Sequence, residues 1–172
     1  ATPSDDRARA RLEWLLDDAE AVVRSAAFDA LKALAAAAAE PATSDLDLAE
    51  IALRSAFEDV RVRALQILVA VGADSPARKR ADRLVGDALD DEAPKVRNEA
   101  FKTLWAWHAR QPKTALELGA RSRHADVRRG VISELERQKG DFVRPLLLEL
   151  VQDAVSEVGL FAYDKLTKAD AD

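Results

Sequence analysis

The chain has 172 residues and a formal net charge of −5, and its composition is 48% hydrophobic and 33% charged. These values exclude intrinsic disorder and allow one well-buried core, and the negative charge argues against bulk nucleic-acid binding. The sequence has no cysteine, which excludes disulfides and thiolate chemistry, and no apolar run approaching the roughly 20 residues of a membrane span. Much of the apolar share is alanine, the best helix former, so the composition favours an all-helical protein.

A nine-residue pattern occurs five times along the chain. Each copy begins with valine, usually followed by arginine, and carries a small or branched apolar residue at offset 4, a large apolar residue at offset 5 and leucine at offset 8. Each residue advances about 100° around a helix, so these positions share one stripe. Each copy therefore predicts one amphipathic helix, the second of a hairpin. The copies begin at Val23, Val60, Val96, Val127 and Val158, with spacings of 37, 36, 31 and 31 residues.

A first helix is predicted before each of these second helices. Ser44, Ser75 and Asp141 are suited to N-caps, and proline fits the first turn at Pro76 and Pro112. No stretch shows the alternation expected of a strand. In chain order, the ten predicted helices span about 5–16, 21–38, 45–56, 60–72, 76–89, 95–110, 112–121, 127–139, 142–152 and 155–168.

Hairpins of this length, with acidic turn residues and a valine–arginine start to the second helix, resemble the HEAT repeat. The shorter spacing of the last copies resembles the HEAT-like variant found in phycobilisome lyases. The resemblance implies an all-α fold, an α-solenoid that forms a right-handed superhelix of about five hairpins in one domain, 1–172. The repeats would span about 5–40, 44–72, 75–110, 112–139 and 141–168. The chain begins at Ala1 and contains no methionine, so we expect it to be part of a longer array.

The arginines at offset 1 are predicted to be structural. Offset 1 lies inside the apolar arc of the helix, so the side chain cannot face solvent freely. We expect each guanidinium to be mostly buried and bonded to turn residues or carbonyls. Asp18 and Asp91, five residues before their valines, are the candidates for a bidentate pair. The arginines concerned are Arg24, Arg61, Arg97 and Arg128.

The second helices carry an excess of about eight positive charges, and the rest of the chain an excess of about thirteen negative ones. The resemblance implies that second helices line the concave face of the solenoid. Four of the positive charges are the structural arginines, which leaves a modest field able to steer an acidic partner. The residues expected to contact a partner from this face are Lys32, Arg63, Lys102, Trp105, Arg129 and Arg137.

For the tryptophans and two apolar residues near the C-terminal end, the pattern must decide between a solvent-facing and a core position. Trp105 is either a partner contact or is folded between hairpins, whereas Trp107 is expected in the core and Trp14 in packing. Leu160 and Phe161 occupy solvent-facing offsets of the last copy, where Gly159 replaces the arginine. They predict a contact surface at the C-terminal end; the alternative is that a rotated helix makes both of them core.

The residues that carry chemistry do not gather into a pattern. His108 and His124 are the only histidines and lie on different hairpins, without acidic or cysteine residues at ligand spacing. No catalytic residue, metal site or cofactor is expected.

The sequence therefore predicts a cytoplasmic, non-enzymatic binding or scaffolding module for a protein or peptide. The alternative is a nucleic-acid-binding protein resembling HEAT-like alkylpurine DNA glycosylases, which would need a strongly basic groove with aromatic and acidic residues. Bilin lyase activity is supported only by the short repeats. Neither nucleic acid nor membrane is an expected partner, and the oligomeric state is left open.

Overall fold

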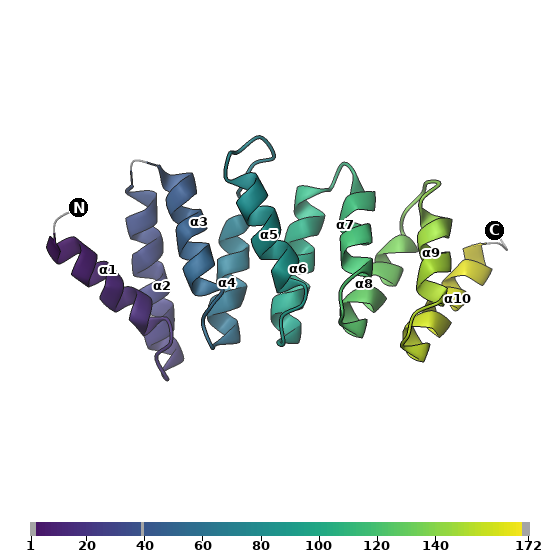
Figure 1. Cartoon of the computed structure of the whole chain (residues 1–172), viewed down its shortest axis with the longest axis horizontal. Coiled ribbons are helices and arrows are strands. Elements are labelled where there is room, and N and C mark those ends of the chain that lie inside the picture. Colours follow the sequence, from purple (N-terminus) through teal and green to yellow (C-terminus); the bar gives the residue numbers. More distant parts are fainter. Residues whose placement is uncertain (1–2, 39, 170–172) are drawn as a thin grey trace. The chain divides into compact units, whose positions relative to one another are not determined.

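The computed structural model describes residues 3–38 and 40–169, and within these ranges it contains ten α-helices and no strand (Figure 1). The all-helical prediction is therefore confirmed for the described residues, in helix number and order. The helices are α1 (Pro3–Leu15), α2 (Ala21–Ala36), α3 (Pro41–Ala52), α4 (Glu58–Leu68), α5 (Arg78–Ala88), α6 (Pro94–Trp107), α7 (Pro112–Ala120), α8 (Ala125–Leu135), α9 (Val143–Val151) and α10 (Ser156–Ala169). The predicted domain 1–172 also includes residues 1–2, 39 and 170–172, which lie outside the described ranges.

Helix ends differ from the predictions by a few residues. Helix α3 begins at Pro41 rather than after Ser44, because proline at the first helical position needs no hydrogen-bonded N–H. Ser75 accepts a hydrogen bond from the Ala77 N–H, but regular helix begins later, at Arg78. Five of the ten predictions extended too far at the C-terminal end by two to four residues, chiefly in the second helices, where apolar residues continue beyond the last regular turn.

The chain divides into two compact units, one ending at Ala88 and the other starting at Leu89. The boundary falls between α5 and α6, inside the third predicted repeat. The first unit therefore contains α1 to α5, and the second contains α6 to α10.

In the first unit, helices that follow one another in sequence pack together from α1 to α4, and α2 also contacts α4. Helix α5 is linked to α3 by Arg80, whose guanidinium pairs with Asp47 and Glu50. The fully buried side chains of this unit include Phe28, Leu46, Leu65 and Leu68.

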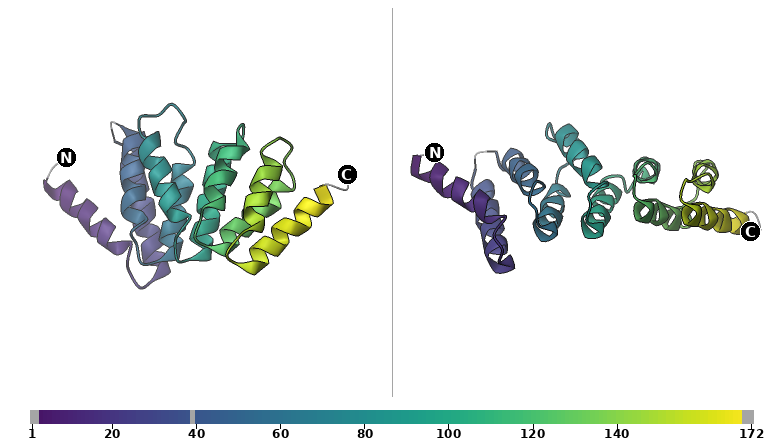
Figure 2. Two further views of the ribbon diagram at one scale, coloured as in Figure 1. Left: turned by 45° about the vertical axis from the view of Figure 1, so that its right-hand side comes forward. Right: turned by 60° about the horizontal axis from the view of Figure 1, so that its bottom comes forward.

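In the second unit, each of α7 to α10 packs against its neighbour in sequence, and α8 also contacts both α6 and α10. The right-hand view in Figure 2 shows α7 and α9 side by side in one layer and α8 and α10 in a second layer. Between the layers lies a core cluster that includes Leu116, Val131, Ile132, Leu147 and Val158.

The repeated pattern accounts for this core. Offsets 4 and 8 are buried in all five copies, as a single apolar stripe requires. The ten residues are Ala27, Leu31, Ala64, Leu68, Ala100, Leu104, Val131, Leu135, Ala162 and Leu166. None of the described helices combines the length and apolar character needed to cross a membrane.

Candidate functional site

The four arginines at offset 1 share one geometry. In each, Nη1 donates a hydrogen bond to the backbone carbonyl six residues earlier, in the turn of the same hairpin, at 2.8 to 2.9 Å. The acceptors belong to Asp18, Ser55, Asp91 and Ser122. Arg24, Arg61 and Arg97 are buried, and the Arg128 side chain is only 11% exposed. The predicted structural role of these arginines is confirmed.

Arg24, Arg97 and Arg128 also reach the next hairpin. Arg24 pairs with Asp59 at 2.9 Å, Arg97 with Asp126 at 2.6 Å, and Arg128 with Asp153 at 2.6 Å. We call these contacts the arginine joints. The sequence analysis gave Asp18 and Asp91 as candidates for a bidentate pair, whereas the carboxylates that pair with these three arginines in the structure come from the next hairpin.

The carboxylates of Asp18 and Asp91 close their own turns. One oxygen of Asp18 accepts the N–H of Glu20 at 2.9 Å, and one oxygen of Asp91 accepts the N–H of Ala93 at 2.8 Å. Their backbone carbonyl oxygens accept the hydrogen bonds from Arg24 and Arg97. Short polar side chains commonly bond to the backbone two residues on, and this local bond fixes their direction.

Two of the joints, at Asp126 and Asp153, lower the pKa of the carboxyl group. The hydrogen bond from Arg128 lowers the pKa of Asp153 below its ordinary value, against an opposing effect of burial. Burial also opposes ionisation of Asp126, but the hydrogen bond and charge of Arg97 outweigh it and lower that pKa as well. The pKa of Arg128 is raised by its hydrogen bond to Asp153. All three groups are therefore held in their charged forms.

A second kind of joint was missed by the sequence analysis. The Ser55 hydroxyl donates to Asp17 at 2.7 Å, and Asp17 also accepts the Ala56 N–H at 2.9 Å. Ser122 and Asp90 repeat this arrangement in the second unit at 2.8 Å. The sequence contained a signal for this joint. An Asp-Asp pair in one turn is followed by Arg-Ser in the turn of the next hairpin, once at 17–18 and 54–55 and again at 90–91 and 121–122.

Most residues expected to contact a partner are already paired. Lys32 is exposed, but the other basic residues form ion pairs with nearby acids. The pairs are Arg63 with Asp29, Lys102 with Glu99, Arg129 with Glu157 and Arg137 with Glu134. The positive charge on the second helices is thus balanced locally, and the field is weaker than the charge count suggested.

The structure agrees with one of the two predicted alternatives for Trp105 and differs from the predictions for Trp107 and Trp14. Trp105 is half-buried, packs against the core cluster of the second unit, and lies 6.3 Å from the Phe101 ring. Trp107 is also half-buried rather than in the core. Trp14 is 60% exposed, so its predicted packing role is wrong. It lies two residues before the buried Leu16, about 200° around the helix, and carries Arg11 over its ring at 4.1 Å.

The structure separates Leu160 from Phe161. Leu160 is 69% exposed, whereas Phe161 is half-buried against the core cluster, with Arg129 and Lys165 near its ring at 5.6 and 5.3 Å. The prediction that both face solvent is therefore corrected for Phe161. Gly159 is required by packing, because a Cβ atom there would lie 2.8 Å from the backbone oxygen of Val151.

Within each unit, neighbouring second helices pack against each other, and they differ in the residue at offset 3 of the later helix. Between α2 and α4 this residue is Arg63, whose guanidinium stacks on the Phe28 ring at 4.2 Å. Between α8 and α10 it is Phe161. Between α6 and α8 it is Gly130, and a Cβ atom built there meets nothing within 4 Å. The groove between these two helices is consequently open.

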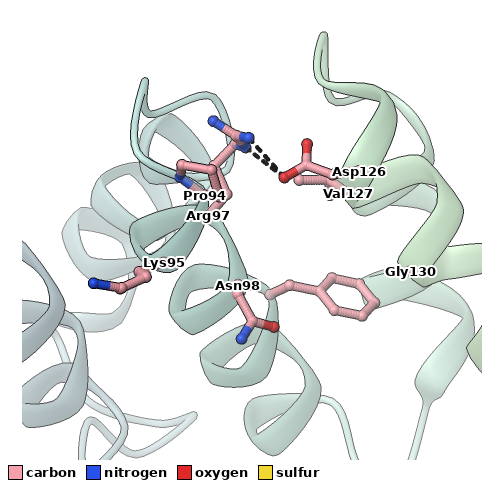
Figure 3. A pocket seen from close by; sticks show the side chains of 8 residues that line it. Pro94, Lys95, Arg97, Asn98, Asp126, Val127 and Gly130 are labelled. Carbon is pink, nitrogen blue, oxygen red and sulfur yellow. Dashed lines mark hydrogen bonds and ion pairs between the residues drawn. The ribbon is translucent and has the colours of Figure 1, made fainter. Parts of the chain in front are cut away.

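The open groove between α6 and α8 has a volume of about 390 Å³. Figure 3 shows the Arg97–Asp126 pair on one side of it, Asn98 on α6 and Gly130 on the facing helix. The groove is lined by Pro94, Lys95, Arg97, Asn98, Phe101, Asp126, Val127 and Gly130. Within the described chain, no three histidine, cysteine or acidic residues lie close enough together to hold a metal ion.

No protein-family model matches the sequence, and no curated protein matches it significantly. Among solved structures, the chain is similar to the X-ray structure of YibA from E. coli, with 17% sequence identity and a TM-score of 0.49. The match covers 100% of this chain and 65% of that one, so the chain spans about two thirds of the matched protein. A likeness of this level carries no argument about fold family or function.

Proposed function

We propose that the chain is a non-enzymatic protein-binding module. In this proposal, about five HEAT-like hairpins stack into a right-handed solenoid and present the even-numbered helices to a peptide or protein partner. The open groove between α6 and α8 is the observation that carries the proposal. A close-packed helical repeat normally fills such a space with its own side chains, as the α2–α4 groove does with Arg63.

Each repeat has some positions that pack the hairpins together and others that vary from copy to copy, and this difference supports the proposed function. Offsets 1, 4 and 8 hold the hairpins together through the core and the arginine joints. Offsets 2, 3 and 6 differ from copy to copy. Repeat proteins with such a division present an extended surface whose specificity is set by the variable positions.

The character of the open groove favours binding over chemistry. Its charged residues include Arg97 and Asp126, which neutralise each other. The remaining lining consists of Pro94, Phe101, Val127 and Gly130 with the polar Asn98 and Lys95, and it holds no nucleophile next to a base. Mostly apolar lining with a few polar groups is typical of a recognition pocket. A module without cysteine also suits a reducing compartment such as the cytoplasm.

Selection of linear peptides from a random phage-displayed library against the full chain tests the proposal. Bound peptides should shift backbone amide resonances of α4, α6, α8 and α10 in ¹⁵N-labelled protein. Failure to enrich any peptide, or shifts confined to the odd-numbered helices, would contradict it. Fluorescence anisotropy with duplex DNA tests the nucleic-acid alternative, which requires tight binding that weakens steeply with salt.

A further inference from the structure

We propose that the chain binds a second copy of itself head to tail, with the hairpin α9–α10 of one copy stacked on the hairpin α1–α2 of the next. The surface on α9–α10, called here the C-terminal face, consists of Leu148, Leu160 and Tyr163. The surface on α1–α2, the N-terminal face, consists of Trp14 and Val22. None of these residues lines the open groove, so the inference goes beyond the proposed function.

The first observation is that hairpins inside the chain are joined at fixed offsets. The residue just before the repeated valine, at offset −1, is an acid that pairs with an arginine of the preceding hairpin in three copies. The arginine stands at offset 1 in two of these pairs and at offset 2 in the third. The pairs are Arg24 with Asp59, Arg97 with Asp126, and Arg129 with Glu157. Offset −1 of one hairpin therefore meets offsets 1 and 2 of the hairpin before it.

The second observation is that both faces lack these charges. At offset −1 of the first copy stands Val22, which is 73% exposed. At offsets 1 and 2 of the last copy stand Gly159 and Leu160, and Leu160 is also largely exposed. The first copy thus has no acid at offset −1 to receive an arginine, and the last copy has no arginine at offset 1 or 2 to offer. The two faces have lost the two halves of the same ion pair.

Offset 5 shows that the C-terminal face is a stacking surface without its cover. Phe28, Leu65 and Ile132 occupy this offset in earlier copies and are at most 1% exposed. Ile132 lies on α8 and is buried in the core cluster together with residues of α10, in the following hairpin. Tyr163, at the same offset of α10, is 56% exposed. A large, partly polar ring at such a position is typical of an interface.

The first helices carry a second matched pair of positions. Glu117 of α7 stands ten residues before its repeated valine, and Glu149 of α9 stands nine residues before its own. The two glutamates line the same pocket, so these positions lie near each other when one hairpin stacks on the next. Leu148 stands at the ten-residue position of the last copy and Trp14 at the nine-residue position of the first. Both are exposed apolar residues in place of the glutamates.

The third observation is that the replacements match each other. Helix α8 contacts both α9 and α10, and Figure 2 shows how the hairpin α9–α10 continues the two layers of α7–α8. A second copy stacked in the same way would bring Val22 against Leu160 and Trp14 against Leu148. Repeat arrays normally end in polar faces. Exposed apolar side chains at the stacking positions of both faces instead indicate a contact that removes them from water.

The missing arginine also selects the occupant. Three of the other copies carry an acid at offset −1, and such an acid would be buried against Leu160 without a partner. The first copy carries Val22 there and avoids this cost. Its nearby Asp18, at the offset of Asp153, is half-buried and accepts the Glu20 N–H. The chain's own first hairpin therefore fits the C-terminal face better than a hairpin with an acid at offset −1.

Sedimentation velocity of the full chain tests for the association. The two faces differ, so each added copy leaves one of each kind free, and assemblies larger than a dimer should form. The sedimentation coefficient should therefore rise between about 1 μM and about 500 μM protein, a range that covers modest affinities. High salt should not dissociate the assemblies, because the contact contains no ion pair. A single species with the mass of one chain throughout this range would overturn the inference.

Two single variants test the head-to-tail arrangement. Val22→Lys and Leu160→Lys change exposed side chains, so both should fold, which thermal unfolding by circular dichroism checks. Each should self-associate at least tenfold more weakly than the unmodified chain. A mixture of the two should form a 1:1 dimer and nothing larger, because one intact face remains on each variant. Leu118→Lys, at an exposed leucine of α7 outside both faces, is the control and should associate normally.

The alternative occupants give different outcomes. If Val22→Lys still self-associates as the unmodified chain does, α10 pairs with its own copy and the head-to-tail contact is wrong. If Leu160→Lys does so, the N-terminal face pairs with itself and the inference is equally wrong. A mixture that fails to form the 1:1 dimer would also overturn it. The residues of the open groove are unchanged in all three variants, so these results leave the test of peptide binding independent.

Discussion

The groove between α2 and α4 in the first unit and the open groove between α6 and α8 in the second are built on the same plan. Arg24 and Arg97 bond in the same way to their own turn and to the next hairpin, and Phe28 and Phe101 occupy the same offset. The grooves differ at offset 3, where one has arginine and the other glycine. The comparison shows that the residues joining hairpins are distinct from those that determine what a groove can hold.

The largest expected effect on stability comes from breaking one of the arginine joints. Arg128→Ala should lower the free energy of unfolding by about 3–5 kcal/mol, because it leaves the Asp153 side chain, 6% exposed, as a buried charge without its partner. Arg24→Ala should cost less, since Asp59 is 46% exposed and can be solvated. Urea unfolding followed by circular dichroism measures both. Equal losses would show that burial of the carboxylate does not set the strength of a joint.

The same joint predicts a pH dependence. The pKa of Asp153 is lower in the folded chain than its ordinary value of 3.8, so its contribution to stability is present above that value and is lost as the pH falls through the folded pKa. Stability measured from pH 6 to pH 2 should therefore fall below about pH 4. Asp153→Asn keeps an acceptor for the Val155 N–H and should flatten this fall. An unchanged pH profile in the variant would contradict the assignment.

Gly119→Ala tests the support beneath the open groove. The new Cβ atom would lie 2.6 Å from Val131 and 2.8 Å from Phe101, the aromatic residue that lines the groove. We expect a loss of about 1–3 kcal/mol, typical of overpacking. Gly86→Ala is the control, because it makes the same change where nothing lies within 4 Å. A gain in stability at position 119 would mean that Phe101 can move aside.

The repeat and its core could be predicted from the sequence because the apolar stripe of a helix is a local property. The arginine assignments followed from the same geometry. Their aspartate partners did not, because Asp59 and Asp126 come from the next hairpin and only the stacking of hairpins brings them near. Each lies 29 or 35 residues from its arginine.

The open groove was also missed, for a different reason. The sequence analysis considered the side chains present on the second helices and selected charged and aromatic residues. The feature that matters is the lack of a side chain at Gly130. Trp105 was left between two alternatives and Phe161 was misplaced, because side chains at offsets near the edge of the apolar stripe can turn toward either solvent or the core. A comparison of offset 3 across the five copies could have found the groove.

Arg63→Ala would make the first groove resemble the second. It removes a guanidinium stacked on Phe28 and hydrogen-bonded to Ser25, but this side chain is partly exposed. We therefore expect a loss of only about 1 kcal/mol. Chemical denaturation is again the measurement, with Arg137→Ala, at an exposed ion pair, as a control expected to change little. A loss above about 3 kcal/mol would show that Arg63 holds the hairpins together as the arginines at offset 1 do.

Gly130→Ala is expected to have the smallest effect, and in the opposite direction. The helix gains a better helix former, and the added methyl group meets no atom within 4 Å, so the free energy of unfolding should rise by about 0.5–1 kcal/mol. Arg63→Ala and Gly130→Ala thus place the same residue at the same offset and should change stability with opposite signs. A loss of stability at position 130 would mean that the groove is closed in solution, and it would remove the physical basis for a peptide site there.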